Sequence, residues 1–164
     1  MRAICPRQLT RMALTAAVFA MALGVVSWAQ TSDPVVGTWK LDVAKSTYEP
    51  GPAPKSATVV IDAVGKAIKV VVNAVMSDGA AMKWGYTSAR DGKDVLVTGN
   101  PSYDTANVTQ MTPTEGRIVY KKAGKTIVTS ETSVAKDGKT MTVTTKGTDP
   151  KGQAINIVAV YTKQ

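Results

Sequence analysis

The stretch ATVVIDAVGKAIKVVVNAVMSDGAAMKWGYTSA, residues 57–89, decides the fold class. Apolar and polar side chains alternate along most of it, which is the period of a half-buried β-strand. Val64-Gly65 and Asp78-Gly79 divide it into three short segments, and glycine supplies the positive φ that tight hairpin turns need. The stretch therefore predicts three consecutive antiparallel strands joined by hairpins.

The same pattern continues from Gly37 to Gln164, with turn signals every ten residues or so and no long helical period. It predicts strands over residues 36–43, 57–63, 67–75, 80–89, 94–98, 104–111, 117–121, 126–134, 140–146 and 154–162. The loop of residues 49–54 holds three prolines and can form neither a helix nor a strand ladder. A meander of about eight to ten strands without crossover helices favours an all-β, up-and-down antiparallel barrel.

The N-terminal residues have the features of a secretory signal peptide. A basic start is followed by an apolar run over residues 12–28, and Ser27 and Ala29 are small residues at the −3 and −1 positions. We expect a signal helix over residues 1–29 that is cleaved after Ala29. The alternative is an uncleaved anchor helix, for which the run is slightly short and lacks a following charge cluster.

Cleavage would leave one barrel domain over residues 30–164, secreted or periplasmic and without stable membrane insertion. Its formal charge would be +5, from 17 Lys and Arg against 12 Asp and Glu. Fifteen of these cations are lysines spread over turns and strand faces. A nucleic-acid surface more often gathers arginine with aromatic residues, so we expect no nucleic-acid partner. Dispersed lysines favour solubility, and weak attraction to anionic envelope surfaces is the alternative.

Composition also excludes several kinds of chemistry. Cys5 is the only cysteine and lies in the predicted signal peptide, and the chain has no histidine. The mature domain would therefore have no disulfide, no thiolate nucleophile and no Cys or His metal ligand, and we expect neither a metal nor a cofactor. Catalysis would have to use carboxylates, lysine, serine or tyrosine, and no local spacing assembles such a set. We expect a protein that is not an enzyme and has no catalytic residues.

Met82, Trp84 and Tyr86 alternate on one predicted strand and so share a face. If that face points inward, its aromatic rings and thioether would suit a flat or aliphatic small molecule. The alternative is an ordinary barrel core in which the same side chains contact one another. Tyr120 would add a phenolic hydroxyl in either case. Met82, Trp84, Tyr86 and Tyr120 are therefore the candidate ligand-binding residues.

The segment Gly37-Thr38-Trp39-Lys40-Leu41-Asp42 resembles the opening of lipocalin-like and avidin-like barrels, whose tryptophan plugs the closed end. Residues 37–46 and 50–55, with 98–101 and 136–142, are similar to a family of small secreted bacterial proteins with a lipocalin-like barrel and no established activity. The resemblance implies a lipocalin-like barrel with Gly37 and Trp39 as structural residues at one end. A ligand contact by Trp39 is the alternative, and Lys163 or Arg117 could lie over its ring.

Features of particular lipocalin-like families are absent from this sequence. It lacks the Thr-Asp-Tyr turn and the C-terminal helix of lipocalins proper, the several tryptophans of biotin-binding barrels and the histidine of haem-binding barrels. The ligands of those families therefore do not transfer. By the same resemblance, the loop of residues 49–54 would be a fixed lid over the barrel mouth or a plain connector.

These patterns lead to two functional hypotheses. The first is a secreted, non-catalytic barrel that binds a small apolar or amphipathic ligand. The second is an interaction or adhesion module without a ligand cavity, whose partner is an envelope component or a second copy in a homodimer. The last strand favours the second, because Val158 lies on a face nearly as apolar as that of Ile157. The volume of the interior discriminates between the two.

Overall fold

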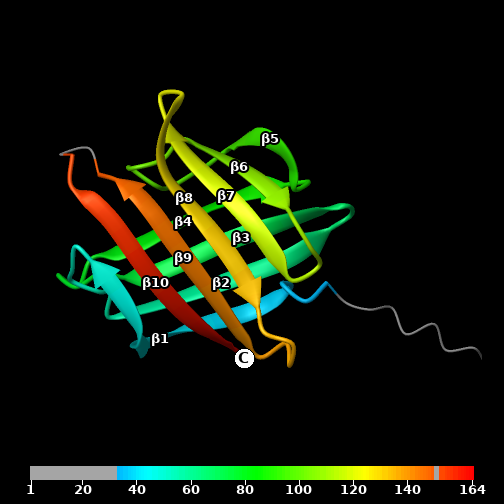
Figure 1. The fold of residues 1–164 in the computed structure, drawn as a ribbon, viewed down its shortest axis with the longest axis horizontal. Coiled ribbons are helices and arrows are strands. Elements are labelled where there is room, and N and C mark those ends of the chain that lie inside the picture. The colour runs from blue at the N-terminus through cyan, green and yellow to red at the C-terminus, as the bar shows by residue number, and fades with distance from the viewer. Residues whose placement is uncertain (1–32, 150–151) are drawn as a thin grey trace, which may run out of the picture. The chain divides into compact units, whose positions relative to one another are not determined.

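Ten antiparallel strands form one continuous sheet in the computed structural model, which describes residues 33–149 and 152–164 (Figure 1). The predicted signal peptide lies outside these residues. The strands are β1 Gly37–Glu49, β2 Ser56–Val64, β3 Ala67–Val75, β4 Ala81–Ser88, β5 Asp91–Leu96, β6 Thr105–Gln110, β7 Glu115–Lys122, β8 Lys125–Val134, β9 Thr140–Thr148 and β10 Ala154–Lys163. None of the described residues belongs to a helix that is long and apolar enough to span a membrane.

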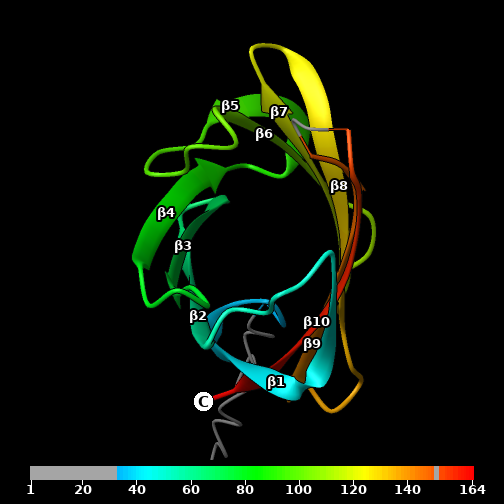
Figure 2. The same ribbon diagram turned by 90° about the vertical axis from the view of Figure 1, so that its left-hand side faces the viewer.

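The sheet is two meanders joined through the first and last strands. Its order is β4-β3-β2-β1-β10-β9-β8-β7-β6-β5, so β1 lies between β2 and β10. The sheet curls until β4 and β5 meet, as the end-on view in Figure 2 shows. There the backbones of Gly85 and Thr98 exchange two hydrogen bonds of 3.0 Å, which form an isolated bridge. The predicted all-β, up-and-down antiparallel barrel is confirmed.

The first strand is longer than the sequence predicts. It runs to Glu49 instead of ending at residue 43, because a bulge between Asp42 and Thr47 lets the chain bend and pair with β10 again. Ser46 stabilises the bulge: its hydroxyl donates to the Asp42 carbonyl at 2.7 Å and accepts the Val160 N–H at 2.9 Å. Alternating patterns cannot reveal such an irregular segment.

β1 pairs with the last strand, β10, on both sides of the bulge. Val158 pairs with Thr47, and Val160 pairs with Asp42. Both valines are half-buried in the single chain. β10 therefore has a neighbouring strand at each edge, β1 on one side and β9 on the other.

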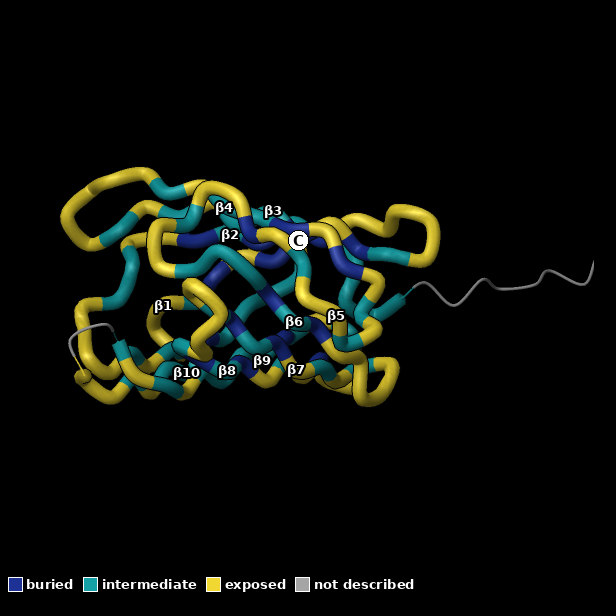
Figure 3. Tube along the Cα trace, turned by 90° about the horizontal axis from the view of Figure 1, so that it is seen from above, coloured by how far each residue is buried: buried dark blue, intermediate teal, exposed yellow. Residues whose placement is uncertain are grey.

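Buried residues lie along the middle of the strands, while exposed residues gather at the turns (Figure 3). Many of the buried residues line the barrel interior. The larger core cluster contains Trp39, Val59, Ile61, Ile68, Val70, Tyr86, Val97, Ala106, Val108, Ile118, Tyr120, Val128, Val134 and Met141. Leu41, Ala57 and Ala159 form a second, smaller cluster. The apolar face that alternation assigns to each strand is thus the inner face.

Trp39 lies at the end of the barrel where the described chain begins, and it is fully buried. Its indole N–H donates to the Val35 carbonyl at 2.8 Å. The Lys163 ammonium lies 5.0 Å from the ring centroid and donates to the Pro34 carbonyl at 3.1 Å. Gly37 makes room for this lysine, because a Cβ at residue 37 would lie 2.7 Å from its Cε. Packing at this end of the barrel therefore explains both the glycine and the tryptophan of the Gly-x-Trp motif.

The proline-rich loop connects β1 to β2 and passes across the opposite end of the barrel, as Figure 2 shows. Lys55 fixes its far end by donating its N–H to the Val75 carbonyl at 2.8 Å. Tyr48, just before the loop, is one of the residues that line the interior. The loop thus lies where a lid over the mouth would be.

Candidate functional site

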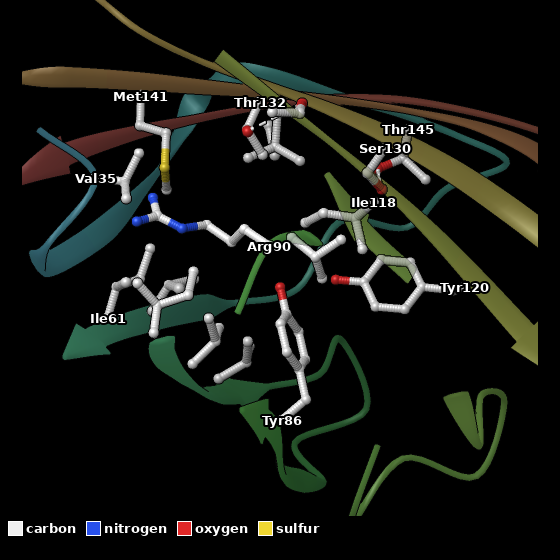
Figure 4. A pocket seen from close by; sticks show the side chains of 18 of the residues that line it. Val35, Ile61, Tyr86, Arg90, Ile118, Tyr120, Ser130, Thr132, Met141 and Thr145 are labelled. Carbon is white, nitrogen blue, oxygen red and sulfur yellow. Dashed lines mark hydrogen bonds between the residues drawn. The ribbon is translucent and has the colours of Figure 1, made fainter. Parts of the chain in front are cut away.

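The barrel interior holds a cavity of about 260 Å³. Its walls are mostly valine, isoleucine and aromatic side chains, and every strand except β5 contributes to them (Figure 4). Apolar walls with a few polar groups are typical of sites for small molecules. The cavity is large enough to exclude a completely filled core, and it forms the candidate site.

Four aromatic rings meet on one side of this cavity. Tyr103 and Tyr120 stack with their centroids 4.8 Å apart. The indole of Trp84 packs edge-on against Tyr120 at 5.7 Å and against Tyr103 at 6.5 Å, and Tyr86 lies 6.4 Å from Tyr120. Edge-to-face and stacked pairs at these distances are favourable beyond the area they bury. The rings therefore form a rigid aromatic wall.

Three of the four candidate ligand-binding residues line the cavity: Trp84, Tyr86 and Tyr120. Met82 pairs with Ala74 near the beginning of β4, is half-buried and lies outside the cavity lining. Trp39 is also outside the lining, beneath Val35, which does line the cavity. The three aromatic candidates therefore belong to the cavity lining, and Met82 does not.

Burial gives the tyrosines unusual acid–base properties. It raises the pKa of Tyr86 to about 12, and hydrogen bonding to Tyr120 opposes part of that rise. Burial also raises the pKa of Tyr120, helped by the neighbouring Tyr86. Figure 4 shows the two phenolic oxygens facing each other. The pKa values of Tyr48, Tyr103 and Tyr161 are raised by burial as well. The phenols are therefore neutral hydrogen-bonding groups at physiological pH.

We expect an alkaline titration followed by tyrosinate absorbance at 295 nm to show less ionisation of the folded protein at pH 10 than of the unfolded chain, in which a tyrosine is half ionised at that pH. Tyr86 keeps its proton to about pH 12 in the folded state. The folded protein therefore binds more protons than the unfolded one as pH rises through this window, so stability decreases from about pH 10 upward. Urea titrations at pH 8 and pH 10.5 would check the slope. Separate ionisation of five tyrosines near pH 10 would contradict the burial described.

Hydroxyl groups on strands β8 and β9 add polar atoms to the cavity lining. The Ser130 and Thr145 hydroxyls are 2.7 Å apart and hydrogen-bonded to each other. Thr132 donates to the Gly116 carbonyl at 3.2 Å. All three residues line the cavity (Figure 4). Because these hydroxyls already have partners within the protein, they need no ligand to satisfy them.

Arg90 is a site residue that the sequence analysis missed. It follows β4 in the turn to β5, and its side chain crosses the interior to lie beside Val35 and Met141 (Figure 4). Its φ of 59° is in the left-handed region, which costs a residue other than glycine about 1–2 kcal/mol. Ser88 Oγ accepts the Arg90 N–H at 3.0 Å and holds this backbone in place.

The Arg90 guanidinium has a single ionic partner among the described residues. Its Nη2 lies 2.5 Å from Oδ2 of Asp33, in the segment that leads into β1. Its Nε is buried and has no hydrogen-bond partner in the described part of the chain. Unsatisfied buried donors are rare in folded proteins because losing water costs free energy that no new bond repays. Arg90 thus brings an incompletely satisfied positive charge to an apolar cavity.

The described residues contain no group of three or more His, Cys, Asp or Glu side chains that could hold a metal ion. Within the cavity lining, Arg90 and Glu115 are the charged residues. Glu115 begins β7 and is exposed at the rim. The lining therefore offers a ligand apolar surface, hydroxyl groups and one guanidinium, with the Glu115 carboxylate at the rim.

No family model matches the chain, and no curated protein matches it. Among solved structures, the chain is similar to the zebrafish ileal bile acid-binding protein complexed with cholic acid, with 14% identity and a TM-score of 0.49 over 80% of this chain and 99% of the other. It is also similar to the siderocalin Ex-FABP, with 13% identity and a TM-score of 0.35 over 80% of this chain and 74% of the other.

Proposed function

We propose that the protein is a secreted or periplasmic, non-catalytic barrel that reversibly binds a small apolar or amphipathic molecule inside the barrel. The observation that carries this proposal is the interior cavity of about 260 Å³. A barrel built only as a scaffold can fill its interior with side chains, and small barrels often do. Here the inner faces of both meanders leave space between them.

The chemistry of the lining agrees with this function. The aromatic wall of Trp84, Tyr86, Tyr103 and Tyr120 offers flat apolar surface, and the aliphatic side chains of the other strands complete the enclosure. Such a site gains binding free energy by removing apolar ligand surface from water, at about 25 cal/mol per Å². A few placed polar groups then orient the ligand.

The two ends of the barrel would have different roles in ligand access. Trp39 and Lys163 fill part of the end near the described N-terminus, where the exposed turn residues Thr112 and Pro113 also line the cavity. The opposite end is crossed by the loop between β1 and β2 (Figure 2). In this proposal a ligand enters past the proline-rich loop, which acts as a fixed rim. Export and the relation to the small secreted bacterial family are part of this proposal and are supported by the signal-like residues 1–29 and the Gly-x-Trp motif.

Binding can be tested with N-phenyl-1-naphthylamine, a neutral dye that fluoresces in apolar surroundings. We expect saturable enhancement with the wild-type protein. Ala159→Leu should weaken dye binding about tenfold or more, because Ala159 is 4% exposed and lines the cavity, so a larger side chain would occupy ligand volume. Fluorescence titration measures both affinities.

The matched control is Leu96→Ala, since Leu96 is 75% exposed on β5 and lies outside the interior cavity. This variant should bind the dye as the wild type does. Native mass spectrometry of protein purified from its own host would show whether a ligand is carried. If the dye does not bind, or if Ala159→Leu binds it equally well, the cavity is not the binding site and the interaction-module hypothesis gains weight.

A further inference from the structure

A largely buried guanidinium in a mostly apolar cavity limits which ligands can fill that cavity. Arg90 is the only cationic residue among the described residues that line it. Guanidinium cannot lose its proton at any pH the protein meets, so the charge persists in the bound state. A purely hydrocarbon ligand would cover this charge without offering it an acceptor, which is unfavourable.

We propose that the ligand is an amphiphile with a carboxylate and that Arg90 binds this carboxylate inside the barrel. Asp33 would hold the same guanidinium when the cavity has no ligand. This inference rests on the proposed binding function and specifies its ligand class.

The donor arrangement of Arg90 is that of a half-filled carboxylate site. Nε and Nη2 lie along one edge of the guanidinium plane, and such an edge can bind both oxygens of a carboxylate in parallel. Asp33 contacts Nη2 through Oδ2 and leaves Nε without an acceptor in the described part of the chain. A ligand carboxylate that met both nitrogens would satisfy the donor that Asp33 leaves open.

Asp33 is positioned to give up this contact. Its side chain is 23% exposed, so the carboxylate reaches water while it contacts Arg90. Its other carboxylate oxygen, Oδ1, accepts the Val35 N–H at 3.2 Å, and its carbonyl accepts the Val36 N–H at 3.0 Å. Neither of these two bonds uses Oδ2, the atom that contacts Arg90. Asp33 therefore competes with the ligand carboxylate for Arg90.

The position of Arg90 also fixes the orientation of the ligand. The guanidinium lies beside Val35 and Met141, toward the end of the barrel that holds Trp39 (Figure 4). Trp84 and the stacked rings of Tyr103 and Tyr120 lie further along the barrel. The carboxylate would therefore bind near the Trp39 end, with the apolar part of the ligand against these rings.

The test compares decanoate with 1-decanol, which has the same chain length and no charge, as competitors for bound N-phenyl-1-naphthylamine. We expect decanoate to displace the dye at a concentration at least about tenfold lower than 1-decanol does. Arg90→Met should remove this preference and leave displacement by 1-decanol within about twofold. Asp33→Asn should strengthen decanoate binding about threefold or more, because the competing carboxylate is gone.

Arg117→Met is the matched control, since Arg117 is the other arginine among the described residues and pairs with Glu131 on the outer surface at 3.0 Å. It should keep the decanoate preference. If Arg90→Met does not fold, the wild type and Asp33→Asn still provide the comparison. Equal displacement by the two competitors, or an Asp33→Asn variant with unchanged decanoate affinity, overturns the carboxylate assignment alone. Absence of any dye binding overturns the proposed function and this inference together.

Discussion

Trp39→Ala is expected to lower the free energy of unfolding by about 3–5 kcal/mol, the usual cost of truncating a fully buried large aromatic side chain. Trp39 is 0% exposed and packs in the larger core cluster. The substitution also leaves the Val35 carbonyl without its indole donor and removes the ring that Lys163 covers. For a domain of this size the loss corresponds to a decrease in Tm of roughly 10 °C or more.

Urea unfolding followed by far-ultraviolet circular dichroism would measure this loss. Trp39→Phe should recover part of it, because a phenyl ring fills much of the space but cannot donate to Val35. The Leu96→Ala variant, at an exposed position, should change stability by less than about 0.5 kcal/mol. A loss below about 1 kcal/mol for Trp39→Ala would show that the barrel end closes without the indole.

Gly147→Ala is expected to destabilise the barrel by about 2–3 kcal/mol, although it adds a single methyl group. Gly147 lies in β9 opposite Val128 of β8 and Ile155 of β10. A Cβ at residue 147 would lie 2.7 Å from both Cα and Cγ1 of Val128 and closer still to the Ile127 carbonyl oxygen. Two of these three atoms belong to backbone, so the strands themselves would have to separate.

The control for this substitution is Gly124→Ala in the turn between β7 and β8. A Cβ there meets no atom within 4 Å, but φ is +77°. Its expected cost is therefore about 1 kcal/mol, from backbone strain alone. Chemical unfolding of both variants separates crowding from strain. If Gly147→Ala costs no more than Gly124→Ala, then β8 and β9 do not approach as closely as described.

The strand pattern could be predicted from the sequence because each element carries a local signal. Residues 67–75 alternate and end at turns, and the predicted bounds match β3 without change. The extension of β1 to Glu49 could not be predicted, since it depends on a hydrogen bond between Ser46 and Val160, residues far apart in the chain. Long-range pairing of this kind leaves no local period in the sequence.

The candidate site was predicted in part for the same reason. Trp84 and Tyr86 share a face by strand geometry, and the structure turns that face inward. Met82 lies on the same face of β4, but it is the second residue of the strand and lies outside the cavity lining. Arg90 was missed because it precedes the turn residues Asp91-Gly92, where an arginine is ordinarily a solvated surface residue. A signal was available, since Arg90 is one of only two arginines after residue 11.

The pairing of β1 with β10 has a consequence for how the chain folds. Trp39 pairs with Lys163, so the contact that joins the two meanders closes a loop of nearly the whole domain. Closing a long loop costs entropy before any contact repays it, and proteins rich in such contacts fold slowly. During synthesis β1 cannot pair with β10 until residues 154–163 have left the ribosome. Until then the edges of β1 and β9 that face β10 stay unpaired, and unpaired strand edges are sites where other chains can add a strand.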